Sequence, residues 1–254
     1  SLSLFAKLVR FFIKNYVSVI MLGDINQLPS IKYGRCFEDI INSDRIDIYR
    51  LTRILRVKAG ATDPIIVNST NIVTSPSYEV IPSHNFHLIN NVNLRYTVQS
   101  LVTNNNISLS NVRTHKFITF TNDDSTELNS ILSNLINPWN QSRNISCYVK
   151  QQKSNGNKTK IQLRYSIGDP VIFTKNNIYP YVSNGCEGII SGFTNDNDMI
   201  VEYKGRNIKV PLIRVRGSTD EFIVKHVLLA YSITVHKSQG SEWSNVYFYI
   251  NSYP

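Results

Sequence analysis

The sequence predicts an α/β fold: a parallel sheet with flanking helices, interrupted by a small β-rich insertion. Residues Val17–Leu22 form a continuous apolar run that ends in Gly-Asp, which is typical of a buried parallel strand. Residues Lys116–Phe120 form a second apolar run, followed by a helical pattern that stops at Pro138. From 161 to 222 the chain changes to short alternating runs with Gly and Asn turns, which is typical of an antiparallel barrel of SH3-like size.

Helices are predicted on either side of the first strand. The apolar residues of 1–16 recur on one stripe of a helix, with Lys7, Arg10 and Lys14 off that stripe. This periodicity excludes a targeting segment, whose apolar residues would be continuous. Pro64–Ile72 is expected to be helical after its first turn, whereas Asn68–Leu101 predicts irregular or weakly helical structure.

The clearest predicted unit is a strand, a loop and a helix beginning at Lys116. After the strand, Asp124-Ser125-Thr126-Glu127 fits the pattern of a capping box, so we expect the helix to begin there. Apolar residues then follow at helical spacing up to Ile136. Strands are expected in the insertion at Pro170–Phe173, Gly188–Phe193, Met199–Tyr203 and Asn207–Val215, and buried runs after it at Ile223–Tyr231 and Val246–Ile250.

The charge balance favours a polyanionic partner. The chain has 27 Lys and Arg against 18 Asp and Glu, a net charge of +9, which indicates nucleic acid first and an anionic membrane surface second. No apolar run reaches the roughly 20 residues that span a bilayer. The 3 cysteines are widely spaced and form no CxxC pair, which argues against a zinc site or a disulfide framework and favours a reducing compartment.

Polar residues gather at the ends of three apolar runs. Asp24 and Gln27 follow the first strand in the segment GDINQLPS, and Arg56 ends the segment LTRILR. The third segment, Ala230–Trp243, reads AYSITVHKSQGSEW. Amide, guanidinium and imidazole groups at the carboxyl edge of a sheet are suited to holding phosphates. The alternatives are a strand-ending turn for Gly23–Ser30 and a surface salt bridge for Arg56.

These three segments, in this order, resemble motifs of superfamily 1 helicases of the RecD/TraA and Pif type. Gly23–Ser30 resembles GDxxQLPPV, with Ser30 at the second proline. The arginine segment resembles L-x-x-I-x-R followed by Gln, with Val57 at the Gln position, and the run from Thr234 to Glu242 resembles motif V. Phe120–Pro138 and Gly168–Ile190 match further segments, so the resemblance covers nearly the whole chain.

The resemblance implies a RecA-like P-loop NTPase motor fold with an inserted SH3-like β-barrel. Residues 1–50 would be the end of the first RecA-like motor domain, and residues 51–160 the first part of the second. Residues 161–222 would be the inserted barrel, after which the second motor domain continues over 223–254.

The resemblance also implies which residues carry function. Gln27 and Arg56 are the expected catalytic residues, which would sense the γ-phosphate of ATP, and Glu242 would accept a hydrogen bond from its ribose. The expected ATP-binding residues are Gly23, Asp24, Gln27, Arg56, Gln239, Gly240 and Glu242. The expected nucleic-acid-binding residues are Thr121, Asn122, Thr234, His236 and Lys237. Mg²⁺ would be bound mainly by residues upstream of this chain.

The implied activity is ATP-dependent translocation on single-stranded DNA with unwinding of duplex junctions, inside the cell and away from membranes. Such an enzyme would serve DNA replication, recombination or repair. The sequence contains no GxxxxGK[ST] loop, so we expect a fragment of a longer helicase that is inactive alone. Two alternatives remain open: an RNA-directed superfamily 1 helicase of a viral replication protein, and a non-catalytic nucleic-acid-binding remnant of a motor.

Overall fold

The computed structural model describes residues 2–29, 33–52, 62–75, 77–90, 93–138, 144–152, 158–218 and 221–251. The chain divides into two compact units, Ser1–Asn90 and Asn91–Pro254. The first unit contains helices and turns in its described residues, and the second contains a parallel sheet with helices and a β-rich part. Among the described residues, no helix has the length and apolar character needed to cross a membrane.

The first unit has helices α1 (Leu2–Lys14), α2 (Cys36–Ile41) and α3 (Pro64–Thr74). The helices predicted for 1–16 and for Pro64–Ile72 are therefore confirmed. α3 begins where its local sequence favours a helix, because the Asp63 side chain accepts a hydrogen bond from the Ile65 backbone N–H at 2.9 Å. Pro64 at the first helical position has no N–H to leave unsatisfied.

The buried strand predicted for Val17–Leu22 is wrong for this structure. The segment is not part of a sheet, and Ile20 and Leu22 are each 90% exposed. A parallel strand is stable only when neighbouring strands satisfy its N–H and C=O groups. The described residues of the first unit contain no such neighbour, so an apolar run alone does not produce a strand here.

The second unit is built around a parallel sheet with the strand order β11-β1-β12. The central strand is β1 (His115–Thr119), and its neighbours are β11 (Ser232–Thr234) and β12 (Asn245–Tyr249). Helices α4 (Leu94–Asn104) and α5 (Asn122–Ile136) share an apolar core with β1, centred on Val98, Phe117, Leu128 and Leu132. The short helices η2 (Val112–Thr114) and α6 (Val235–Ser238) precede β1 and follow β11.

Helix α5 begins earlier than the Asp124–Glu127 pattern predicts. Its cap is Thr121, whose Oγ1 accepts a hydrogen bond from the Asp124 N–H at 3.1 Å and donates to Asp124 Oδ2 at 2.6 Å. Thr121, and not Asp124, is therefore the N-cap residue of this helix. The helix ends at Ile136, before Pro138, as predicted.

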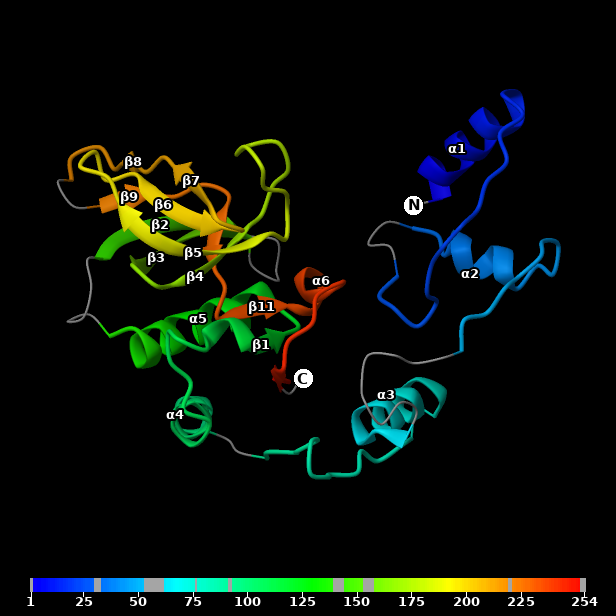
Figure 1. The fold of residues 1–254 in the computed structure, drawn as a ribbon, viewed down its shortest axis with the longest axis horizontal. Helices are drawn as coiled ribbons and strands as arrows, with labels where there is room; N and C mark the ends of the chain where they lie inside the picture. The colour runs from blue at the N-terminus through cyan, green and yellow to red at the C-terminus, as the bar shows by residue number, and fades with distance from the viewer. Residues whose placement is uncertain are drawn as a thin grey trace. The chain divides into compact units, whose positions relative to one another are not determined.

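The β-rich part forms two sheets that lie on the same side of α5 in Figure 1. One sheet has the order β10-β4-β5-β6-β7 and the other β3-β2-β9-β8. Four elements lie close to the predicted strands: β4 (Pro170–Phe173), β5 (Glu187–Phe193), β6 (Met199–Tyr203) and β7 (Arg206–Val210). The other five are β2 (Asn144–Gln152), β3 (Lys158–Ser166), β8 (Ile213–Arg214), β9 (Glu221–Ile223) and β10 (Val227–Leu229).

The closed SH3-like barrel is not confirmed, because the described strands form two separate sheets around one core. β2 pairs with β3 along its whole length and with β9 in parallel, which assembles a second sheet. Buried residues of both sheets, among them Tyr165, Phe173, Met199 and Phe222, form that core. The β5–β6 turn at 195–198 does form a hairpin, with Asn197 at φ 65.

Candidate nucleotide and nucleic-acid site

The carboxyl ends of β1 and β11 lie side by side at one edge of the parallel sheet. Thr119 is in register with Thr234, so the residues that follow the two strands leave the sheet together. Open parallel sheets bind ligands at this edge. The structure therefore brings the segment after β1, which contains Asn122, next to the segment after β11, which contains Lys237.

A direct contact joins these two segments. The Lys237 Nζ donates a hydrogen bond to Asn122 Oδ1 at 3.4 Å. Partial burial lowers the pKa of Lys237 by desolvation. His236 is exposed in the short helix α6, whereas Thr234 is only 6% exposed at the end of β11. The residues predicted to bind nucleic acid thus follow or end the two neighbouring strands β1 and β11, and two of them are in contact.

The fifth of these residues, Thr121, is engaged in capping α5. Its hydroxyl contacts the backbone and carboxylate of Asp124, and the Asn251 Nδ2 donates to Asp124 Oδ1 at 3.4 Å. A carboxylate at a helix N-terminus already complements the helix dipole. The start of α5 is therefore occupied by the chain's own negative charge.

Strand β11 is held in place by polar side chains of α5. Asn129 accepts from the Ser232 N–H at 2.9 Å and donates to the Ser232 carbonyl at 2.8 Å, and the Ser125 Oγ donates to the same carbonyl at 3.0 Å. These bonds replace the pairing that an edge strand lacks and fix the direction in which Thr234 leaves the sheet. Sequence reasoning interpreted this part of α5 mainly as packing. The available signal was a polar Asn129 within the apolar stripe.

The loop after α6 carries Gln239, Gly240 and Glu242. Gly240 has φ +83, a conformation that disfavours other residues, and the Ser241 N–H donates to the Ser238 carbonyl at 3.0 Å. Gln239 and Glu242 are exposed. Gly240 therefore lies in a tight turn, and the exposed Gln239 and Glu242 are on the same chain segment as His236 and Lys237.

The other predicted nucleotide residues belong to the first unit. Asp24 accepts from the Asn26 N–H at 2.9 Å and from Gln27 Nε2 at 3.3 Å, so Asp24 and Gln27 form one exposed turn. A Cβ at Gly23 would lie 2.8 Å from the Phe37 ring, which makes glycine the residue that fits there. Arg56 lies outside the described residues.

The sequence analysis did not predict a buried polar cluster centred on Asp169. Asp169, which is fully buried, accepts hydrogen bonds from Asn137 Nδ2 at 2.7 Å, Tyr231 OH at 2.7 Å and the Ser166 N–H at 2.8 Å. Burial raises the pKa of Asp169, although these donors oppose the shift. The cluster joins the end of α5, the β3–β4 turn and the residue before β11. Gly168, at φ +95, shapes that turn, where a Cβ would lie 2.9 Å from Leu109 Cδ1.

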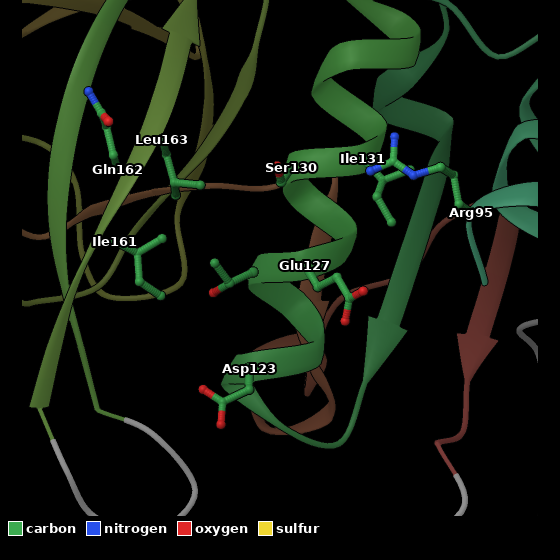
Figure 2. Close-up of a pocket in the computed structure, with 9 residues that line it drawn as sticks. Arg95, Asp123, Glu127, Ser130, Ile131, Ile161, Gln162 and Leu163 are labelled. Atoms are coloured by element: carbon green, nitrogen blue, oxygen red, sulfur yellow. The ribbon is translucent and has the colours of Figure 1, made fainter. Parts of the chain in front are cut away.

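A groove of about 490 Å³ separates α5 from β3. Figure 2 shows Ile161 and Leu163 of β3 on one side, and Glu127 and Ser130 of α5 on the other. Its charged lining residues are Asp123, Glu127 and Arg95, which give a net charge of −1. Carboxylates repel phosphate, so this groove is not where the fold would place a nucleic-acid backbone.

The described residues contain no group of three His, Cys, Asp or Glu side chains that could hold a metal ion. Mg²⁺ bound to a nucleotide needs carboxylate or hydroxyl oxygens arranged around it. The described part of the chain supplies no such group of carboxylates.

Comparisons with known proteins bear on the fold of the chain. Residues 1–69 match a family model described as an AAA domain. The Pif1 helicase from Bacteroides in complex with ADP-AlF3 and ssDNA matches with a TM-score of 0.54 and 20% identity, covering 92% of this chain and 56% of that chain. The chain shares the fold of the matched part of this Pif1 helicase.

A second structure supports the same conclusion about the fold. It describes DNA unwinding at forked dsDNA by two coordinating Pif1 helicases, and it matches with a TM-score of 0.50 and 20% identity, covering 91% of this chain and 54% of that chain. The resemblance to Pif-type superfamily 1 helicases is thereby confirmed at the level of the fold. The chain spans about half the length of the solved helicases it matches.

Proposed function

We propose that this chain is the C-terminal motor part of an ATP-dependent DNA helicase that translocates on single-stranded DNA and unwinds duplex. The observation that carries the proposal is the sheet edge where Asn122 meets Lys237, next to His236 and the Gln239–Glu242 turn. The match of residues 1–69 to an AAA domain and the fold shared with a DNA-bound Pif1 helicase support it.

In this proposal residues 1–50 end the first RecA-like motor domain. Residues 51–160 and 223–254 form the second, and the β-rich segment 161–222 is inserted within it. β2, from the motor range, pairs with β3, so the inserted strands and the motor share a sheet. The inserted part would then move with the second motor domain during the ATPase cycle.

ATP would be bound by residues of both motor domains. Gly23, Asp24 and Gln27 of the first motor domain would contact it, as would Arg56, Gln239, Gly240 and Glu242 of the second. Arg56 would stabilise charge that develops on the transferred phosphoryl group. The Gln27 amide, oriented by Asp24, would sense the γ-phosphate. Mg²⁺ would be held by residues that this chain does not contain.

Single-stranded DNA would lie along the sheet edge. Lys237 and His236 would contact backbone phosphates, with Thr121, Asn122 and Thr234 beside them. Contacts to phosphates carry no base information, so binding would be independent of sequence and sensitive to salt. The proposed DNA path does not enter the groove beside α5, because the net negative charge of that groove would repel the phosphates of the strand.

Replacing Lys237 by glutamine is expected to weaken binding of the chain to a single-stranded oligonucleotide. One phosphate contact is lost, so the salt dependence of log K should fall by about 0.7 to 1. Fluorescence anisotropy of a labelled oligo-dT at several salt concentrations measures both effects. Running the titration with oligo-U tests the RNA-directed alternative, because tighter binding to RNA would favour it.

The matched control is Lys209→Gln, which also removes one charge. Lys209 lies on β7 and pairs with Asp198 at 2.8 Å, away from the sheet edge. Glutamine at 209 should leave binding nearly unchanged. Equal losses in the two variants would mean that only net charge matters and would contradict the proposed DNA path.

The 254-residue chain is expected to hydrolyse ATP only at background rate, with or without single-stranded DNA. Its sequence contains no GxxxxGK[ST] loop to hold the β- and γ-phosphates. Phosphate release by the purified chain measures this. Turnover stimulated by DNA would show that the chain holds ATP by other residues, and the assignment of a motor part that depends on upstream residues would fall.

A further inference from the structure

Lys116 is a buried lysine in the central strand of the parallel sheet. It is only 1% exposed. Its Nζ donates to Glu187 Oε2 at 2.8 Å and to the Ala230 carbonyl at 2.5 Å, and it lies 5.4 Å from the centroid of the Trp243 ring. An ammonium has three N–H donors, and an aromatic face attracts a cation. Two oxygens therefore accept hydrogen bonds from the ammonium, and the Trp243 ring lies within cation–π range of its charge.

These three partners come from different parts of the unit. Glu187 begins β5 of the inserted sheet, and Ala230 precedes β11. Trp243 follows Glu242 directly, at the end of the loop proposed to contact ATP. The Trp243 ring packs against a small buried cluster of Ile172, Ala230 and Ile233. Lys116 thus joins the inserted β part, the parallel sheet and the nucleotide loop at one point.

Because the Lys116 ammonium is buried, the ion pair of Lys116 with Glu187 is stable only while both partners are present. Desolvation lowers the pKa of Lys116, while Glu187 opposes that shift. Removing one partner of a buried ion pair leaves an uncompensated charge, whereas an apolar residue of similar volume would fill the same space at no such risk. The role that an ion pair can have beyond filling the core is to specify one relative position for the groups it joins.

We propose that Lys116 is a positioning residue that fixes Trp243, and with it the Gln239–Glu242 loop, against the inserted β part through Glu187. This inference rests on the proposed function, because it assigns the loop to ATP. Nucleotide bound at the loop and the orientation of the inserted β part are then coupled through a single side chain.

The contact itself is tested without nucleotide. The chain has 2 tryptophans, so a Trp139→Phe background leaves Trp243 as the only tryptophan emitter. In that background, Lys116→Met and Glu187→Gln should each shift Trp243 emission to longer wavelength and increase its quenching by acrylamide. Circular dichroism checks that each variant is folded. If Lys116→Met fails to fold, Glu187→Gln decides, because the Glu187 side chain is 29% exposed and keeps its shape as glutamine.

Arg113→Met is the matched control. Arg113 in η2 pairs with Glu202 of β6 at 2.6 Å, so it joins the same two parts of the unit through an exposed ion pair. Its ion pair does not include Trp243, so its loss should leave Trp243 emission unchanged. Equal changes in Trp243 emission in all three variants would overturn the proposal. Loss of any ion pair between these two parts of the unit would then be enough to alter the surroundings of Trp243.

The coupling is tested in a longer protein that joins this chain to its upstream phosphate loop. Lys116→Met and Glu187→Gln should raise KM for ATP about five-fold or more with little change in kcat, since five-fold is the lower end of typical coupling between sites. Arg113→Met should leave KM unchanged. Unchanged KM in all variants, with an altered Trp243 signal, would overturn the coupling alone. Absence of ATPase in the unmodified protein would instead refute the proposed function and leave the fluorescence result standing.

Discussion

Replacing Asp169 by alanine is expected to lower the free energy of unfolding of the second unit by about 2–4 kcal/mol, since each buried polar group left without a partner costs about 1–3 kcal/mol. The substitution removes the acceptor of Asn137, Tyr231 and the Ser166 N–H at once. Urea unfolding followed by circular dichroism measures the loss. The expected loss of unfolding free energy is larger than for a substitution at a surface site, because water cannot reach the donors that lose their acceptor.

The pH dependence distinguishes this cluster from simple packing. Burial raises the pKa of Asp169 above its ordinary 3.8, so the folded chain takes up a proton at a higher pH than the unfolded chain. As pH falls from neutral towards 3.8, the unmodified chain should gain stability relative to Asp169→Ala, by up to about 1.4 kcal/mol per pH unit. The difference between the two proteins therefore grows on acidification.

Asp198→Ala is the matched control for this prediction. Asp198 forms an ion pair with Lys209, whose side chain is 59% exposed, and exposed ion pairs contribute about 0–1 kcal/mol. Its loss should be small and should not grow as pH falls towards 3.8. A pH-independent difference for Asp169→Ala would mean that Asp169 is not the buried titrating group assigned here.

Replacing Arg56 by alanine is expected to lower kcat for ATP hydrolysis by about 10³-fold or more, in a protein that joins this chain to its upstream phosphate loop, because arginines at a transferred phosphoryl group contribute about 10³–10⁵ in kcat. The guanidinium is proposed to stabilise charge in the transition state and to take no part in binding DNA. Affinity for single-stranded DNA should therefore remain largely intact. Steady-state phosphate release and oligonucleotide anisotropy on the same preparation measure both quantities.

Arg53→Ala provides the comparison within the same segment. Arg53 stands three residues before Arg56, outside the position that matches the family's arginine. It should affect turnover far less. If DNA binding falls as much as turnover in Arg56→Ala, or if turnover survives, the role proposed for Arg56 is wrong.

Local patterns predicted those elements whose residues satisfy one another nearby. β4 and β6 coincide with their predicted runs. β6 pairs with β5 and β7 through turns that lie within a few positions of it, so neighbouring residues determine these hairpins. The end of α5 before Pro138 follows from the missing N–H of proline. Helix α5 begins earlier than predicted because Thr121 caps it in place of Asp124. The Thr121 hydroxyl contacts both the carboxylate and the backbone N–H of Asp124.

Distant partners explain what local patterns missed. Val17–Leu22 has the composition of a strand, yet the described residues of its unit supply no neighbour to pair with it. Asn129 reaches Ser232 across more than a hundred residues of sequence, and no periodicity indicates such a bond. The pattern of β strands predicted one barrel, whereas the pairing of β2 with β3 and β9 forms a second sheet.

The motifs by themselves determined the order of the polar segments and their resemblance to a Pif-type helicase, because turn chemistry and strand ends are encoded in neighbouring residues. Only the tertiary structure decided that Asn122 meets Lys237, that Asp169 lies in a buried cluster and that Lys116 joins Glu187 to Trp243. Those contacts depend on which strands become neighbours, and that choice is made by burial and hydrogen bonding over the whole unit rather than by any single segment.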